Sequence, residues 1–145
     1  MFQNILVPID FSEDSFYALE HGIRLAEKFN STLFILYVNH DESMLFHYLS
    51  EEEYEKIREK ALKEAKQQLE KLIEKFPELK DINCHYNVRR GIPYVEIIEE
   101  LEEKPIDLVI IGSHGRTGAK KFFFGGTAEK VARRAKTNIM ITRRK

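Results

Sequence analysis

The sequence predicts an α/β domain: an open, parallel, five-stranded sheet with helices on both of its faces. Segments with strand character alternate with segments of helical periodicity along the 145 residues, in the order βαβαβαβαβ. The segment 32–38 is a continuous apolar run, as expected of a parallel strand that is covered on both faces. Because crossovers between parallel strands are right-handed, this order indicates a Rossmann-like sheet. We expect one domain over residues 1–145, since no linker or repeat divides the chain.

The start of the chain shows the clearest element boundaries. The apolar run 3–9 predicts the first strand. Ser12 is a suitable N-cap for the helix that follows, and acidic residues occupy its first turn, where the helix dipole favours negative charge. Asn30 is a reasonable end for this helix.

The rest of the chain continues the alternation. The expected elements are a long helix at about 51–76 ended by Pro77, a strand at 82–88, a helix from Pro93 to about Glu103, a strand at 106–111, a short helix near 128–135 and a last strand at 138–142. The long helix has an apolar stripe formed by Tyr54, Ile57, Ala61, Ala65, Leu69, Leu72 and Phe76. Its other faces are rich in Glu and Lys and should be solvated.

Composition excludes several classes of protein. With 43% hydrophobic and 32% charged residues the chain is suited to a soluble globular fold. The apolar runs are too short for a membrane span, and the N-terminus lacks the features of a signal peptide. The single cysteine, Cys84, belongs to an alternating strand pattern, which indicates a buried apolar role, and a lone thiol fits a reducing, cytoplasmic compartment. The five histidines have no ligand spacing, so we expect no metal site made by side chains alone.

The net charge of −1 conceals an uneven distribution. Residues 112–145 contain ten Lys or Arg and one acid, Glu129, and so carry +9, which leaves −10 on the remainder. So basic a segment indicates an anionic partner, either a phosphate group or nucleic acid. A solvated positive face is the alternative.

A glycine-rich loop follows the strand at 106–111. Five of the seven glycines lie in the fifteen residues from Gly112 to Gly126, ahead of a helix. Backbone N–H groups of such a loop, together with those of a helix N-terminus, can hold a phosphate. Neither of the common nucleotide fingerprints, G-x-x-x-x-G-K-[ST] or G-x-G-x-x-G, occurs. Phosphate binding is therefore the interpretation from the residues alone, with a flexible loop as the alternative.

This loop and the start of the chain resemble the universal stress proteins, a likeness that extends over nearly the whole sequence. The ATP-binding members carry Gly-x2-Gly-x9-Gly followed by Ser or Thr, and Gly112, Gly115 and Gly125 match that spacing. The opening ILVPIDFSEDS, with Asp10, is also similar to the family. One position departs from the pattern: Gly126 stands where the motif has Ser or Thr, and the hydroxyl follows on Thr127.

The resemblance implies an adenine-nucleotide α-hydrolase-like sheet of order 3-2-1-4-5, with ATP bound where strands one and four end. Adenine and ribose would meet Asp10 and the Pro8–Ile9 backbone, and Val38 and Ile111 would pack on the base. Ribose and phosphates would be held by Gly112, Gly115, Arg116, Gly125, Gly126 and Thr127. Mg²⁺ or Mn²⁺ would enter with the phosphates.

We therefore expect an ATP-binding, stress-response or regulatory protein without assigned catalytic residues. The alternatives are a slow ATP hydrolase and a nucleic-acid binder that uses the basic C-terminal segment. Asp10 could instead cap the turn into the first helix, and His114 is expected on the loop surface rather than as a general base. The segment 39–50 could be a lid over the nucleotide or a plain connector.

The last strand, Asn138–Thr142, should lie at one edge of the sheet. Its unpaired backbone groups could pair with the same strand of a second copy across a two-fold axis, and the resemblance implies a homodimer of this kind. An exposed edge is the alternative.

Overall fold

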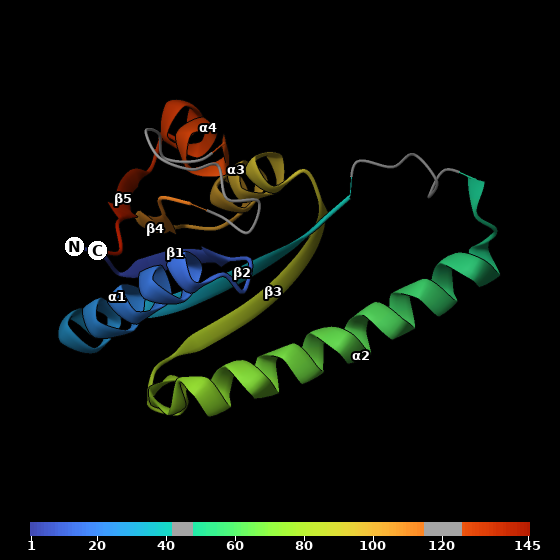
Figure 1. Ribbon diagram of the computed structural model, residues 1–145, viewed down its shortest axis with the longest axis horizontal. Coiled ribbons are helices and arrows are strands. Elements are labelled where there is room, and N and C mark those ends of the chain that lie inside the picture. Colours follow the sequence, from blue (N-terminus) through green and yellow to red (C-terminus); the bar gives the residue numbers. More distant parts are fainter. Residues whose placement is uncertain (42–47, 115–125) are drawn as a thin grey trace.

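A five-stranded parallel sheet lies at the centre of the computed structural model, which describes residues 1–41, 48–114 and 126–145 (Figure 1). The strands are β1 (Asn4–Ile9), β2 (Thr32–His40), β3 (Cys84–Gly91), β4 (Leu108–Gly112) and β5 (Asn138–Thr142). They pair in the order β3-β2-β1-β4-β5, and every pairing is parallel. The predicted fold class and strand order are confirmed.

Helices cover both faces of the sheet. They are α1 (Glu13–Phe29), α2 (Glu51–Lys75), a short 3-10 helix (Pro77–Asp81), α3 (Pro93–Glu103) and α4 (Gly126–Arg134). The core on one face joins α1 and the end of α2 to residues such as Val7 and Ile35. The core on the other face joins α3 and α4 to residues such as Leu6 and Leu36. Neighbouring residues of one strand thus enter different cores, as the two-residue period of a strand requires.

The ends of α1 follow from its sequence. Ser12 adopts an extended conformation and its hydroxyl accepts a hydrogen bond from the Ser15 N–H, as the predicted N-cap should. Asn30 ends the helix in the left-handed conformation, with φ of 54°. Ser50 caps α2 in the same way, accepting from the Glu53 N–H.

Three strands differ from the prediction by two or more residues at one end at least. The second was predicted at 32–38 but spans Thr32–His40. The third strand was predicted at 82–88 but spans Cys84–Gly91, and its pairing with β2 continues to Gly91 opposite His40. The fourth was predicted at 106–111 but spans Leu108–Gly112. Before it, the Asp107 carboxylate accepts hydrogen bonds from the backbone N–H groups of Gln3 and Asn4, and the Asp107 N–H donates to the Asn4 carbonyl oxygen, so side-chain and backbone contacts together join the segments ahead of the strands.

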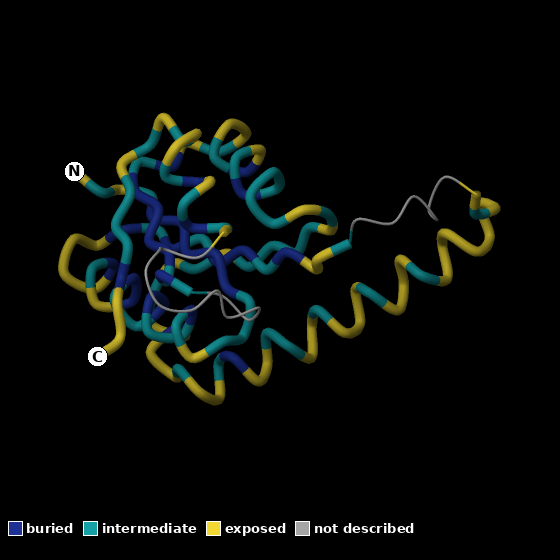
Figure 2. Tube along the Cα trace, turned by 45° about the horizontal axis from the view of Figure 1, so that its top comes forward, coloured by how far each residue is buried: buried dark blue, intermediate teal, exposed yellow. Residues whose placement is uncertain are grey.

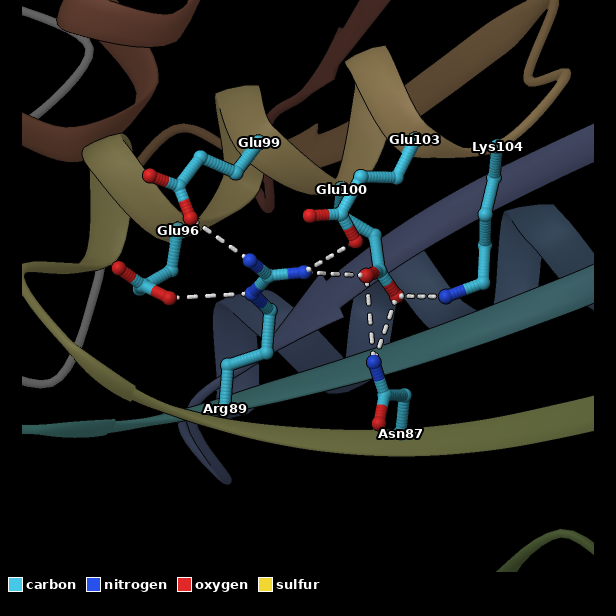
Figure 3. A network of polar contacts seen from close by, with 7 residues as sticks. All are labelled: Asn87, Arg89, Glu96, Glu99, Glu100, Glu103 and Lys104. Atoms are coloured by element: carbon cyan, nitrogen blue, oxygen red, sulfur yellow. Dashed lines mark hydrogen bonds and ion pairs between the residues drawn. The ribbon is translucent and has the colours of Figure 1, made fainter.

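A buried ion-pair network fixes α3 on β3 (Figure 3). Arg89 of β3 reaches four carboxylates of α3, among them Glu100, whose side chain is 1% exposed and lies 2.9 Å from the guanidinium. Asn87 and Lys104 also donate to Glu100. Burial opposes ionisation of Glu100, yet the hydrogen bonds from Asn87, Lys104 and Arg89 hold its pKa below the ordinary value. Arg89 and Glu100 therefore lie between β3 and α3 as an ion pair in which both charges have partners.

The helix α2 extends away from the rest of the molecule (Figures 1 and 2). Of its 25 residues, all of which the structure describes, Leu72 alone is buried. The predicted stripe is therefore only partly covered. No helix in the described ranges is long and apolar enough to cross a membrane.

Candidate functional site

The candidate site lies where β1 and β4 separate. Their register pairs Ile5 with Leu108 and Leu6 with Val109, and the recorded pairing ends there. Pro8, which has no N–H to donate, lies two residues after Leu6 on β1. In an open α/β sheet, ligands bind at such a point, where neighbouring strands lead to helices on opposite faces. Here α1 follows β1 on one face, and α4 comes after β4 on the other.

Asp10 follows the last residue of β1 at this opening. Its Oδ1 accepts a hydrogen bond of 3.0 Å from the Ser12 N–H, and its own N–H donates to the Ser15 hydroxyl over 3.3 Å. The alternative role expected for Asp10, which was to cap the turn into the first helix, is thus present. It fixes where the carboxylate lies, because the cap of α1 holds the same turn.

Phe11 gives the turn an unusual backbone. It has φ of 63°, in the left-handed region that favours glycine. Its ring lies edge-on to Tyr37 at 4.9 Å and also contacts Phe16, so aromatic packing stabilises the conformation. The direction in which the chain leaves β1, and therefore the position of Asp10, depends on these rings.

The predicted apolar residues divide between the two faces. Val38 and Ile111 are buried in the core shared with α3 and α4. Pro8, two residues after Leu6 of this core, lies on the same face of the sheet. Ile9 is buried in the other core, with α1. The side chain of Ile9 is therefore on the opposite side of the sheet from those of Val38 and Ile111.

Gly112 ends β4 against the first turn of α1. A Cβ at this position would lie 2.8 Å from the Asp14 carbonyl oxygen, so the close approach of two backbones requires glycine. This packing reason differs from the role in phosphate binding that the sequence suggested. Three other predicted residues, Gly115, Arg116 and Gly125, lie outside the described residues.

A polar cluster that the sequence did not indicate lies beside Gly112. The Asp14 carboxylate accepts a hydrogen bond of 2.8 Å from Nε of Arg144, and its other oxygen is 3.6 Å from Nδ1 of His114. The Ser113 hydroxyl also lies 3.0 Å from Nδ1 of His114. His114 was expected on the loop surface, but its Nε2 is buried, without a hydrogen-bond partner among the described residues.

This cluster does not have the geometry of a hydrolytic triad. In a triad the serine and the carboxylate address different ring nitrogens, so that the histidine can transfer a proton between them. Here Ser113 and Asp14 both face Nδ1 of His114. The arrangement joins the end of β4 to α1 and to the C-terminal segment.

Comparison with known proteins identifies the family. The sequence model described as the universal stress protein family matches residues 1–143. A universal stress protein of Methanocaldococcus jannaschii, MJ0531, is 31% identical over 144 residues, which cover 99% of this chain and 84% of the relative. The chain belongs to the universal stress protein family.

Solved structures agree with this assignment. The structure of MJ0577, another universal stress protein of M. jannaschii, superposes with a TM-score of 0.81 at 28% identity, covering 100% of this chain and 98% of the other. A universal stress protein in complex with cAMP superposes with a TM-score of 0.68 at 20% identity and covers 98% of both chains. The second likeness concerns the fold alone.

The position at which this universal stress protein departs from the motif is accessible. Gly126 is exposed at the start of α4, and a Cβ added to it would meet no atom of the described residues within 4 Å. Nothing in the packing therefore requires glycine here, in contrast to Gly112. Thr127 follows in the first turn, where backbone N–H groups are free of helical partners.

The basic segment of this universal stress protein is divided among several contacts. Lys130 and Arg134 lie over the Tyr94 ring at 4.8 and 4.9 Å. Arg133 pairs with Glu129 at 3.0 Å, and Arg144 is held by Asp14 as described above. These four cations thus contact α3, α4 and the first turn of α1. Among the described residues, no group of three or more His, Cys, Asp or Glu could hold a metal ion.

Proposed function

We propose that the protein binds an adenine nucleotide, ATP accompanied by Mg²⁺ or Mn²⁺, at the opening between β1 and β4, and acts as a regulatory stress-response protein. The observation that carries the proposal is the position of Asp10 and of the end of β4 on the two sides of a switch point. Membership of the universal stress protein family supports it.

The residues present fit such a ligand. Val38 and Ile111 offer an apolar floor for a base, and Asp10 offers a fixed carboxylate for sugar hydroxyls. Gly126 and Thr127 begin a helix whose N-terminus favours an anion and where added atoms would find open space. A divalent cation would supply charge neutralisation at the outer phosphates. The chain's own residues would orient the nucleotide.

We also propose a homodimer and a cytoplasmic location. The edge strand β5 would pair with its copy in a homodimer, since its outer edge is free of a sheet neighbour among the described strands. The protein would act in the cytoplasm, where a free thiol stays reduced. Burial raises the pKa of Cys84 to about 11, so this thiol is protected rather than reactive.

Titration calorimetry with ATP and with AMP tests the site. Asp10→Ala should weaken both nucleotides by about tenfold or more, because the carboxylate would contact the nucleoside that they share. Asp10→Asn is the matched variant, since it keeps the oxygen that accepts from the Ser12 N–H. Its melting temperature without ligand should equal that of the wild type while both affinities still fall.

Loss of ATP binding alone in Asp10→Ala would contradict the assigned orientation. Absence of any heat or thermal stabilisation with adenine nucleotides would overturn the proposed function itself.

A further inference from the structure

The helix α2 carries an apolar face that continues beyond the part of the molecule it covers. Successive residues of an α-helix are rotated by about 100°. One side of α2 therefore holds Tyr54, Ile57, Ala61, Ala65, Leu69 and Leu72. Leu72 packs into the core at 2% exposure, and beyond it the helix leaves the sheet (Figures 1 and 2).

A large apolar side chain on this projecting part faces water. Leu62, at the edge of the same face, is 62% exposed. Exposure of such a side chain is costly, because apolar area in contact with water is unfavourable.

The projecting part is nevertheless a well-formed helix. Ser50 caps it, and ion pairs one turn apart join Lys56 to Glu52 and Arg58 to Glu55. A helix of 25 residues is about 37 Å long. It can therefore present its apolar face as a rigid surface.

We propose that this face pairs with α2 of a second copy of the chain, antiparallel, with Ala61 on the two-fold axis. In that register Ile57 lies level with Ala65 of the second copy, and the reverse holds across the axis. Ala61 and Ala65 are small, so the two helices can approach to about 8 Å and bury the larger side chains between them. Both copies use the same patch, as a two-fold contact requires.

The charges beside the stripe select the antiparallel arrangement. Lys60 and Glu64 lie on one flank of the face, and Glu55 and Lys66 lie on the other. Across the axis, Lys60 comes within about two residues of Glu64 of the second copy, and Glu55 comes next to its Lys66. A parallel pair would instead place each of these charges beside its own copy, Lys60 against Lys60. Antiparallel pairing also puts the two sheets at opposite ends of the helix pair.

This surface is separate from the β5 edge and from the nucleotide site. A chain that used both α2 and β5 would form an assembly of four copies or more, because each contact has its own two-fold axis. The inference does not depend on nucleotide binding.

Sedimentation equilibrium of the full chain tests the pairing. Ala61→Glu places a charge on the axis and should raise the dissociation constant of the α2 contact at least about hundredfold, halving the mass. Lys63→Gln is the matched control: it makes the same change of −1 in charge on the opposite face of the helix and should leave the mass unchanged. Neither variant should change the melting temperature of the single copy, since both positions lie outside its core.

Exchanging charges provides an independent test. Lys60→Glu and Glu64→Lys should each weaken self-association by about tenfold, because each creates two like-charge contacts across the axis. An equimolar mixture of the two variants should regain wild-type association, since both contacts are then between opposite charges. Effects within one helix cannot produce this recovery.

Three results would overturn the pairing. The first is a single-copy mass for the wild type at high micromolar concentration, and the second is an unchanged mass for Ala61→Glu. The third is a lower melting temperature of Ala61→Glu at unchanged mass, which would mean that α2 packs on its own sheet.

Discussion

Gly126 is the residue at which the sequence and the family motif disagree, and the structure shows room for the usual side chain. A Cβ there meets no atom of the described residues within 4 Å. Gly126→Ser should therefore be accommodated without strain and place a hydroxyl at the N-terminus of α4, where it can contact an outer phosphate. We predict a gain in ATP affinity of about threefold to tenfold, with AMP affinity unchanged.

Thr127→Ala separates this role from that of the neighbouring hydroxyl. If Gly126→Ser brings no gain while Thr127→Ala weakens ATP, then Thr127 already supplies the contact and the motif is displaced by one residue. Calorimetry on both variants with both nucleotides decides between these outcomes.

Single residues also show where sequence reasoning stops. The position of Asp10 at the end of a strand could be predicted, because an apolar run ends there. The packing of Gly112 against Asp14 could not, since a glycine needed for a ligand and one needed for a neighbouring helix look alike in a sequence. The contact between Asp14 and Arg144 spans 130 residues and has no local pattern, so the cluster around His114 was missed.

Among the elements, helix starts were predicted well, whereas the ends of three strands were not. Ser12 and Asn30 act locally, through hydrogen bonds and backbone conformation that their own residue types favour. The extension of β3 to Gly91 was missed because Arg89 and Arg90 interrupt the apolar alternation. Arg89 fits inside the layer only because α3, which is distant in sequence, brings carboxylates to it.

This network predicts a pH dependence of stability. The folded state lowers the pKa of Glu100, whose unperturbed value is 4.5, so ionised Glu100 stabilises the fold at higher pH. That contribution is lost as the pH falls below about 4.5 and through the lower folded-state pKa. Glu100→Gln should therefore show a flatter fall in unfolding free energy between pH 6 and pH 3 than the wild type. Urea unfolding at several pH values measures it.

Removal of the Arg89 cation should destabilise the fold more than removal of the ionisable group of Glu100. Arg89→Met removes one of the three groups that compensate the buried Glu100 charge, leaving Lys104 and Asn87, and should cost about 2 kcal/mol at pH 7. The control Glu99→Gln, at a half-exposed partner of the same guanidinium, should cost less than about 0.5 kcal/mol. Equal losses of unfolding free energy in the two variants would show that the burial of Glu100 has no effect on the strength of its contact with Arg89.

On the scale of the whole molecule, charge is divided between the two sides of the opening. The segment that begins at Gly112 carries +9 and supplies the end of β4, α4 and β5, whereas the remaining residues carry −10 and supply β1 to β3. Part of the +9 lies outside the described residues. A ligand with an uncharged end and an anionic end would therefore bind with its anionic end toward the segment that begins at Gly112.

The role of the metal can be tested at the same scale. A divalent cation bound through the phosphates would offset the charge of ATP near Asp10 and Asp14, but it would have little to bind in AMP. Replacing Mg²⁺ with EDTA should therefore lower ATP affinity by about tenfold and change AMP affinity by less than about twofold. Loss of both affinities, with a lower melting temperature of the free protein, would instead indicate a metal that supports the fold. Equal ATP binding with and without Mg²⁺ would show that backbone and cationic groups alone hold the triphosphate.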